Sequence, residues 1–318
     1  MELRRDGVSY TYLTVLQLRK MYPDAELFLI MGTDMFLSFH TWKEPELIAE
    51  NCTLAVLCRG ELRETEQIGD QKARLEAGGM KIRTVRNDIT AISSSDLRRM
   101  LVFGCAKPFL PDGVHGFIQN TGLYGTGRCY RNLPMEKLEK VVIGLLKPSR
   151  VNHVLGCRDT AVALAERYGA DLVDASRAGI LHDITKALDG PLQLTLCSEY
   201  GIILDEFSEN NPKILHALTG SLVADRIFGE NPAVVNAIRH HTTGKADMTL
   251  LEKIIYVADY MEPNRDFPGV EILRKLAYTD IDKALKLGLE MTLVHLKEQG
   301  SAVSRESREA LAWLSRFD

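Results

Sequence analysis

The sequence predicts an α/β region followed by an all-α region. Three short apolar runs, each bounded by turn residues or a helical pattern, predict buried strands: "LFLIMG" (27–32), "TLAVLCRG" (53–60) and "MKIRTV" (80–85). Strands that alternate with helical patterns indicate a parallel sheet. From residue 135 onward no convincing strand pattern occurs, and apolar residues recur at intervals of three and four, which predicts helices.

The individual elements follow from local patterns. Helices are expected near residues 9–20, 43–50 and 62–77, between and before the strands. The stretch "LYGTGRCYRNLP" (123–134) is rich in glycine and ends in proline, so we assign residues 125–134 to a linker between domains 1–124 and 135–318. Asn-Pro pairs at 211–212 and 231–232 are typical of helix starts, because Asn is a good N-cap and Pro fits the first turn.

The composition excludes several classes of protein. The chain has 318 residues, of which 45% are hydrophobic and 26% charged, with a formal net charge of −4. This balance gives no electrostatic case for a nucleic-acid or membrane partner, and we find no apolar run long enough to span a bilayer. The start lacks the apolar core of a signal peptide, and the six cysteines form no C-x-x-C pair. We expect reduced cysteines and a cytoplasmic location.

Histidines and aspartates recur on the inward faces of the predicted helices. His241 follows Val234 and Ile238 at helical spacing on an apolar face, whereas His240 falls on a polar face with Arg239. We therefore predict that His241 points inward and His240 outward. The same test places His153, His182, His216 and Asp259 on inward faces as well, and Asp183 is adjacent to His182.

Such a set of buried polar groups requires compensation. Each histidine alone fits a hydrogen-bonded core residue, but burying all of them with two carboxylates would cost several kcal/mol per unpaired charge. A divalent metal removes that cost. Imidazole with carboxylate suits Fe, Mn, Zn or Ni, and the absence of cysteine in the set argues against a structural zinc site.

The wider pattern resembles the HD phosphohydrolase superfamily. The doublet in "ILHDITK" (180–186) is supported, in order, by "NHVLG" (152–156), "ILHALTG" (214–220), "AIRHHTTG" (237–244), "MTLLEKIIYVADYMEPNRDFPGV" (248–270) and "SREALAWL" (307–314). Over residues 135–318 these motifs resemble the YqeK-type symmetrical bis(5'-nucleosyl)-tetraphosphatases. The resemblance implies an all-α HD domain that hydrolyses diadenosine tetraphosphate to two ADP at a metal site, with iron as the expected metal.

The resemblance also implies roles for particular residues. Its metal ligands match His153, His182, Asp183 and Asp259. Its substrate-contacting positions match Lys186, His216, His241, Thr242 and Arg265, and its catalytic group comprises Asp183, Lys186, His216 and His241. The histidine that precedes "TTG" in the family is His241, while position 240 varies, in agreement with the helical-face argument.

Lys186 and Arg265 each have a simpler interpretation than substrate binding. Lys186 lies four residues beyond His182, on the same side of the expected helix, where it could bind phosphate; otherwise it is a solvated lysine. Arg265 lies in "EPNRDFPG", on a loop from which it could reach a nucleotide; otherwise it is an ordinary loop arginine.

The first region resembles part of another enzyme family. "ELRRDGVSYT" (2–11), "LIMGTDMFLSFHTW" (29–42), "AISSSDLRR" (91–99) and "GLY" (122–124) are similar to NadD-type nicotinate-nucleotide adenylyltransferases, which implies a partial Rossmann-like fold. Asp34 and Trp42 match positions near the nicotinate site. Ser93, Ser94, Ser95 and Arg98 match the phosphate-binding signature, at what would be a helix N-terminus; the alternative is an ordinary helix cap.

This second resemblance is incomplete. The family's first strand and its H-x-G-H loop do not occur in the 318 residues, and we expect their absence to leave unpaired backbone and apolar surface at the sheet. Either Met1 is a truncated start or the region is a remnant that serves as a scaffold. The nucleotide site of residues 34–98 is therefore interpreted as vestigial.

Three functions remain open at this point. The first is metal-dependent hydrolysis of a dinucleoside polyphosphate by the second domain. The second is adenylyl transfer in NAD biosynthesis, which needs the missing segment. The third is a nucleotide-binding module whose metal is structural. A homodimer is left open by the sequence, and neither nucleic acid nor membrane is expected as a partner.

We expect the purified 318-residue protein to show no adenylyl transfer, because the histidines that stabilise the transferring phosphate in the resembling family have no counterpart here. The measurement is formation of nicotinate adenine dinucleotide and pyrophosphate from ATP and nicotinate mononucleotide. Formation of the dinucleotide above a no-protein control would show that the interpretation of this region is wrong.

Overall fold

The fold is described from a computed structural model that covers the chain except residues 1, 3–4, 59–61, 87–91 and 317–318. The chain forms two compact units, residues 1–91 and 92–318. Parts of three motifs or predicted elements, at residues 3–4, 59–60 and 91, lie outside the described residues. Each unit is treated separately below.

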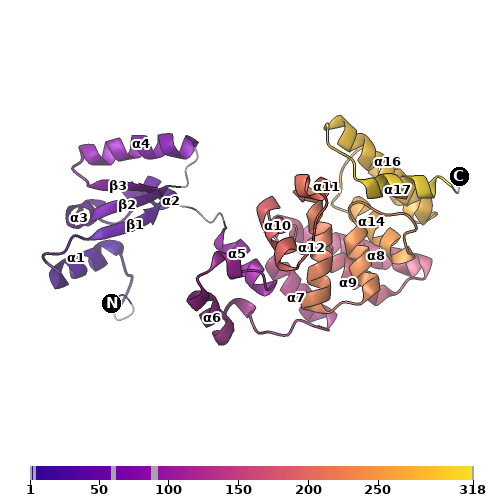
Figure 1. The fold of residues 1–318 in the computed structure, drawn as a ribbon, viewed down its shortest axis with the longest axis horizontal. Coiled ribbons are helices and arrows are strands. Elements are labelled where there is room, and N and C mark those ends of the chain that lie inside the picture. Colours follow the sequence, from indigo (N-terminus) through magenta and orange to yellow (C-terminus); the bar gives the residue numbers. More distant parts are fainter. Residues whose placement is uncertain (1, 3–4, 59–61, 87–91, 317–318) are drawn as a thin grey trace. The chain divides into compact units, whose positions relative to one another are not determined.

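The N-terminal unit is a small parallel sheet with helices on both faces. Strands β1 (Phe28–Gly32), β2 (Thr53–Cys58) and β3 (Ile82–Arg86) lie in the order β1-β2-β3. Helix α1 (Thr11–Met21) covers one face and α4 (Leu62–Ala77) the other (Figure 1), with α2 (Thr33–Leu37) and α3 (Pro45–Asn51) between the strands in sequence. The predicted α/β character and all three strands are confirmed.

One edge of this sheet carries exposed apolar side chains. Among the described residues β1 pairs only with β2. Phe28 is 44% exposed and Ile30 is 67% exposed, although both belong to the strand. In contrast, Leu54 and Val56 of the middle strand are fully buried. The exposed apolar surface expected at the sheet therefore lies along β1.

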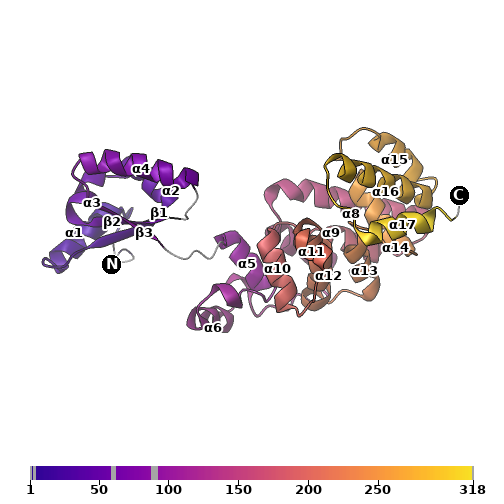
Figure 2. The ribbon, with the colours of Figure 1, turned by 45° about the horizontal axis from the view of Figure 1, so that its top comes forward.

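The C-terminal unit is helical throughout its described part. Its α-helices are α5 (Ser94–Val102), α6 (Asp112–Thr121), α7 (Met135–Leu145), α8 (Val151–Tyr168), α9 (Leu172–Leu181), α10 (Gly190–Glu199), α11 (Glu206–Asn210), α12 (Leu215–Val223), α13 (Pro232–His240), α14 (Leu250–Met261), α15 (Val270–Ala277), α16 (Ile281–Glu298) and α17 (Arg305–Leu314). Figure 2 shows α15 and α16 side by side in contact. The prediction of an all-α second region is confirmed.

The two Asn-Pro pairs behave differently. Asn231 accepts hydrogen bonds from the backbone N–H groups of Ala233 and Val234 and caps α13, as predicted. At the first pair, Pro212 begins a short 3₁₀ turn, and the Asn211 amide donates instead to the carbonyl oxygen of Phe207. Helix α12 consequently begins three residues later than the pair predicts.

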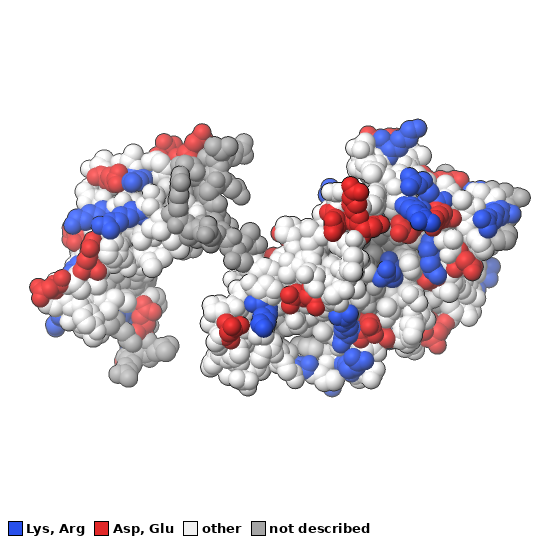
Figure 3. Space-filling view, in the orientation of Figure 1, with Lys and Arg blue, Asp and Glu red and all other residues white. Residues whose placement is uncertain are grey.

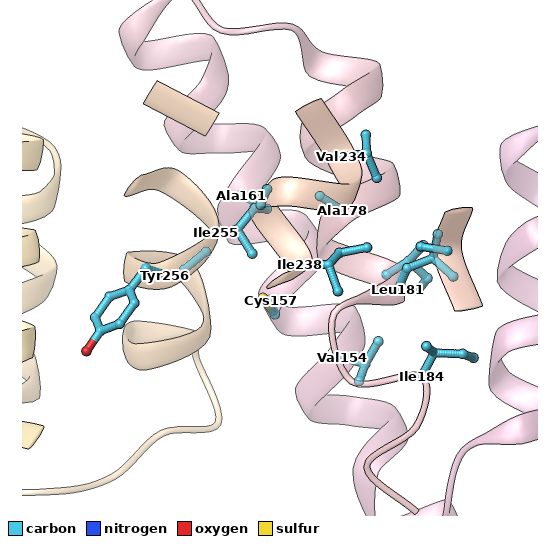
Figure 4. Packing of buried hydrophobic residues seen from close by; sticks show 14 of the residues in the cluster. Val154, Cys157, Ala161, Ala178, Leu181, Ile184, Val234, Ile238, Ile255 and Tyr256 are labelled. Carbon is cyan, nitrogen blue, oxygen red and sulfur yellow. The ribbon is translucent and has the colours of Figure 1, made fainter. Parts of the chain in front are cut away.

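Side chains from α8, α9, α13 and α14 form the centre of the helical core. Val154, Ala178, Leu181, Ile238 and Ile255 are fully buried and directed toward one another (Figure 4). Helices α8 and α9 approach closely because Gly179 has no side chain: a Cβ there would lie 2.7 Å from the Cα of Arg158. This close packing sets the spacing between α8, which carries His153, and α9, which ends directly before His182.

The segment before residue 135 belongs to the helical unit by its packing. Met100, Leu101 and Phe103 share the core cluster of the later helices, and the Arg99 guanidinium donates to the carbonyl oxygen of Leu145 at 2.6 Å. The compact units thus divide near residue 91, whereas the sequence places the domain boundary at 124 and a linker at 125–134. Those limits remain a prediction about ancestry, since packing and ancestry need not coincide.

The surface and the helices give two further facts. No helix within the described ranges combines the length and the apolar character that a membrane crossing requires. Lysine and arginine are intermixed with aspartate and glutamate on the face drawn in Figure 3, in keeping with the net charge of −4.

We predict that Gly179→Ala destabilises the protein by roughly 1–3 kcal/mol, because the new Cβ overlaps backbone atoms of α8. Gly144→Ala in α7 is the matched control: a Cβ there meets nothing within 4 Å, and alanine gains roughly 0.5–1 kcal/mol in a helix. Urea unfolding followed by helical circular dichroism measures both. Equal stability of the two variants would contradict the packing argument.

Candidate functional site

Six polar side chains from five helical segments meet in the interior of the C-terminal unit. Five are at most 7% exposed, and the carboxylate of Asp259 is 17% exposed. They are His153 in α8, His182 and Asp183 directly after α9, His216 in α12, His241 directly after α13, and Asp259 in α14. The structure therefore brings together the five residues that the sequence placed on inward faces and the adjacent Asp183.

The imidazoles form two close pairs with Asp183 between them. The Nε2 atoms of His153 and His182 are 3.2 Å apart, and those of His216 and His241 are also 3.2 Å apart. Asp183 Oδ2 lies 3.5 Å from His182 Nε2, and Oδ1 lies 3.5 Å from His216 Nε2 and 3.7 Å from His241 Nε2. One carboxylate thus faces both histidine pairs.

The second nitrogen of each histidine fixes the ring. Every Nδ1 faces an oxygen acceptor at 2.6–3.1 Å, so Nδ1 carries a hydrogen, and Nε2 is the atom that can bind a metal when the ring is neutral. The acceptors are Glu262 Oε1 for His153 and the carbonyl oxygens of Gly179, Lys213 and Ile238 for His182, His216 and His241. The Nε2 atoms therefore converge on one small region.

The charges of the site favour a cation at this point. Burial alone would raise the pKa of Asp183, but His182 and the hydrogen bonds of His182 and His241 lower it well below its ordinary value. Burial likewise opposes ionisation of Asp259, but the hydrogen bond from His153 and the charge of His182 lower its pKa well below the ordinary value. Both carboxylates are ionised, and two buried negative charges need positive compensation.

The donor set fits a divalent metal ion. Three overlapping groups have ligand atoms within 4.8 Å of one another: His153 with His182 and Asp183, His182 with His241 and Asp259, and Asp183 with His216 and His241. Asp183 Oδ1 is buried without a hydrogen-bond partner among the described residues. An oxygen left without a partner among converging nitrogens is what a bound cation would satisfy.

Sequence reasoning did not single out Glu262, which orients His153. Its carboxylate is 1% exposed, accepts from His153 Nδ1 at 3.1 Å and accepts from the backbone N–H of Asn264 at 2.7 Å. Gly156 makes room for it, because a Cβ at that position would overlap Glu262 Oε2. In the sequence, the position of Glu262 three residues after Asp259 could have indicated that it lies near the site.

Three basic side chains border the site, two of them paired with its carboxylates. Arg265 donates to Asp259 Oδ1 at 2.7 Å, and Arg150, which sequence reasoning also missed, donates to Asp183 Oδ2 at 2.6 Å. Lys186 Nζ lies 3.0 Å from His216 Nε2. The arginine side chains are 33% and 29% exposed, so a ligand can reach them. Such groups suit binding of phosphate.

His216 belongs to the second histidine pair, and its Nε2 atom also faces Lys186 and Thr242. Burial first, and then the charge of Lys186, lower the pKa of His216 to about 3, so its ring is neutral. Burial also lowers the pKa of Lys186. The hydroxyl of Thr242 lies 3.1 Å from His216 Nε2. Lys186, His216, His241 and Thr242 therefore form one contiguous group.

One part of the argument for Lys186 was wrong. Helix α9 ends at Leu181, and residues 182–187 form a series of turns in which Ile184 N–H donates to Leu181 O and Lys186 N–H to Asp183 O. Lys186 does not lie on a helix with His182. These tighter i+3 hydrogen bonds replace the helical ones, and Lys186 reaches His216 from the turns.

The adjacent histidines 240 and 241 separate as the helical-face argument predicts. His241 is 2% exposed and belongs to the site, while His240 is half-buried at the end of α13. Burial, rather than any contact with the carboxylates of the site, lowers the pKa of His240 to about 4. His240 is less exposed than predicted.

The residues of the second resemblance fall in different units. Asp34 lies in α2 and Trp42 packs against Phe39 with ring centroids 5.4 Å apart, beside a cavity of about 230 Å³. Ser93 caps α5 by accepting from the N–H of Asp96, and Ser94 and Ser95 open that helix. Arg98 lies over the Tyr124 ring. Within its own unit each residue has an ordinary structural role.

The fold and the site place an HD domain within the helical unit, where residues 150–264 match the family model described as "HD domain". Over 170 residues the chain is 39% identical to the "Bis(5'-nucleosyl)-tetraphosphatase, symmetrical" of Bacillus subtilis, covering 53% of this chain and 91% of that protein. The chain belongs to this family of HD-type hydrolases.

Two further proteins match most of the chain or its helical part. A Mycoplasma pneumoniae protein named "Probable nicotinate-nucleotide adenylyltransferase/Ap4A hydrolase" is 27% identical over 297 residues, covering 91% of this chain and 76% of its own length. A crystal structure of a predicted HD superfamily hydrolase involved in NAD metabolism, from Clostridium acetobutylicum, is 37% identical with a TM-score of 0.57. That match covers 58% of this chain and 99% of the other.

We predict that His241→Ala lowers phosphohydrolase kcat/KM by about a hundred-fold or more, because it removes an inward nitrogen beside Asp183. His240→Ala is the matched control, one residue away and outside the group, and should change kcat/KM by less than about three-fold. The measurement is steady-state hydrolysis of diadenosine tetraphosphate. Equal losses in both variants would contradict the assignment of the two faces.

Proposed function

We propose that the C-terminal unit hydrolyses diadenosine tetraphosphate to two ADP with the help of a bound divalent metal. The observation that supports this most is the meeting of four histidines and two aspartates beside Lys186, Arg150 and Arg265. The names of the relatives, symmetrical tetraphosphatase and Ap4A hydrolase, indicate the substrate.

The metal would be held by His153, His182, Asp183 and Asp259. Nitrogen and oxygen ligands together suit iron, which we expect, and also manganese, zinc or nickel. The group of Asp183, His216 and His241 has a similar composition and is a second place where an ion would fit. When bound, the ion supplies charge that polarises a phosphoryl oxygen and activates water.

The protein's own groups position the phosphates. Arg150 and Arg265 each extend from a carboxylate toward solvent, so their remaining N–H groups are directed to an incoming polyphosphate. Lys186 and the hydroxyl of Thr242 flank His216 and add two donors on the other side. Phosphoryl transfer depends mainly on such positioning and on neutralisation of charge.

The reaction we propose is a single hydrolysis. The oxygen of one water attacks a central phosphorus, the anhydride bond to the neighbouring central phosphate breaks, and the second ADP leaves with the bridging oxygen. The proton lost by water passes to solvent. An ADP leaving group is already stable as an anion, so little general-acid help is required.

A second candidate is adenylyl transfer of the NAD biosynthetic type, favoured by the coverage of 91% of this chain by the Mycoplasma pneumoniae protein with a double name. It concerns the N-terminal part and needs the phosphate-binding loop that the 318 residues lack. A third, a nucleotide-binding module with a structural metal, predicts binding without turnover. Product analysis separates all three.

We predict that diadenosine tetraphosphate gives ADP as the only early product. In water enriched in heavy oxygen, half of the ADP should carry the label, on its terminal phosphate, because one water oxygen enters per two ADP formed. Chromatography and mass spectrometry of early time points measure both. A chelator should abolish the activity, and so should Asp183→Ala, since that carboxylate faces both histidine pairs.

Two results would contradict this proposal. Equal early amounts of AMP and ATP would mean asymmetric cleavage, so that the placement of the substrate is wrong. Full activity after metal removal, with metal analysis confirming its loss, would exclude the metal-dependent reaction.

A further inference from the structure

A cavity lies where the glycine-rich stretch after α6 meets the end of α5. Its volume is about 310 Å³. Its lining comes mainly from the end of α5, from residues 125–131 and from Arg226 and Ile227, which follow α12. All of these residues belong to the C-terminal unit. None of the residues assigned above to metal or phosphate is among the described residues that line this cavity.

The cavity is basic, although the chain has a net charge of −4. Arg128, Arg131 and Arg226 line it, and none of the described residues in its lining is acidic. Within the described part of the chain, none of these three guanidinium groups forms an ion pair with a carboxylate. Like charges gathered in one place repel one another, and a bound anion offsets that repulsion.

Backbone oxygens hold two of the arginines in place. Arg226 Nη2 donates to the carbonyl oxygen of Tyr200 at 2.9 Å, and the guanidinium lies over the Tyr200 ring, 4.5 Å from its centroid. Arg131 Nη1 donates to the Arg226 carbonyl oxygen at 3.3 Å. Gly229 leaves room for that side chain, because a Cβ there would lie 3.0 Å from Arg131 Nε. A carbonyl oxygen does not neutralise a guanidinium, so the remaining N–H groups suit the oxygens of a phosphate.

The glycine-rich loop is anchored to the helical core. Gly125 and Gly127 both have a positive φ, 84° and 74°. The Tyr130 hydroxyl donates to the Gly125 carbonyl oxygen at 3.1 Å, and a Cβ at Gly125 would overlap that hydroxyl. The Tyr130 ring packs against Phe228, which is fully buried, with centroids 6.0 Å apart. The wall of the cavity that carries two of the arginines is therefore fixed by packing.

We propose that this cavity binds a diphosphate group, that of inorganic pyrophosphate or of a nucleotide. A diphosphate has acceptor oxygens on two phosphorus atoms, so it can bind more than one guanidinium at once. The volume lies at the lower end of the range for small-molecule pockets, which suits a small anion. The inference does not depend on the reaction at the histidine cluster, since the two sites share no described residue.

Cys129 provides a local reporter for the test. It lines the cavity and is exposed, whereas Cys52, Cys105, Cys157 and Cys197 are buried. Iodoacetamide is uncharged and alkylates an accessible thiol, so mass spectrometry of the peptide that contains Cys129 gives its rate of alkylation in the full chain. Because no residue of the histidine cluster lines the cavity, this rate reports occupation of the cavity. Sodium chloride keeps the ionic strength constant.

We expect pyrophosphate at about ten times its Kd to slow the alkylation of Cys129 by about ten-fold, because only the unoccupied cavity reacts. The double variant Arg131→Gln and Arg226→Gln should raise the half-protecting concentration by about ten-fold or more, since charge-assisted hydrogen bonds are lost. Arg239→Gln is the matched control and should match wild type, because Arg239 is also exposed but does not line the cavity.

Melting temperatures show whether the variants fold. Arg128→Gln serves if the double variant does not, because Arg128 lines the cavity and makes no side-chain hydrogen bond within the described part of the chain. ADP is the second ligand. Equal protection by ADP would identify the diphosphate of a nucleotide as the ligand, and protection by pyrophosphate alone would identify the inorganic ion.

Three results would overturn the inference. The first is that neither pyrophosphate nor ADP protects Cys129. The second is protection that is unchanged in the arginine variants. The third is equal protection by sodium chloride at the same ionic strength, which would be a general effect of salt. Hydrolysis of diadenosine tetraphosphate does not enter these measurements, so the proposed function stands or fails independently.

Discussion

The structure of the helical unit depends on one buried carboxylate. Asp183 is 1% exposed, yet it is ionised, because the imidazoles around it, His182 above all, hold its pKa low. An unpaired charge at this depth would cost several kcal/mol. Each helix that supplies a neighbour of Asp183 is therefore constrained in position, and Gly179 allows two of them, α8 and α9, to approach closely enough. The interior polar cluster and the apolar core are parts of one packing arrangement.

Helical periodicity was sufficient to find the inward side chains. Val234, Ile238 and His241 lie on one face of α13 because a helix repeats every 3.6 residues, and that rule needs no knowledge of distant contacts. Two residues of the site that sequence reasoning did not find, Arg150 and Glu262, are placed by contacts between distant parts of the chain. Arg150 meets Asp183 across 33 positions and Glu262 meets His153 across 109. Pairings of this kind arise from packing between helices, which periodicity within one helix does not encode.

Local rules also failed where the chain leaves regular structure. A continuous helix through Lys186 was expected, but α9 ends at Leu181 because the following turns use i+3 hydrogen bonds and Thr185 binds the carbonyl oxygen of His216. Residues 92–124 follow the pattern of the adenylyltransferase-like region and pack with the helical core, while the predicted domain limits remain a prediction. Motif order reflects ancestry, whereas burial reflects the nearest apolar surface available.

The charges of the site explain why its basic side chains can serve a polyphosphate. Asp183 and Asp259 are each paired with an arginine, Arg150 and Arg265, whose side chain remains partly exposed. A divalent ion bound by the carboxylates and histidines would add positive charge beside these two arginines. Polyphosphate supplies the matching negative charge. Arg265 would then lie between two anions, the carboxylate of Asp259 and a phosphate, and would hold the phosphate next to the residues that bind the ion.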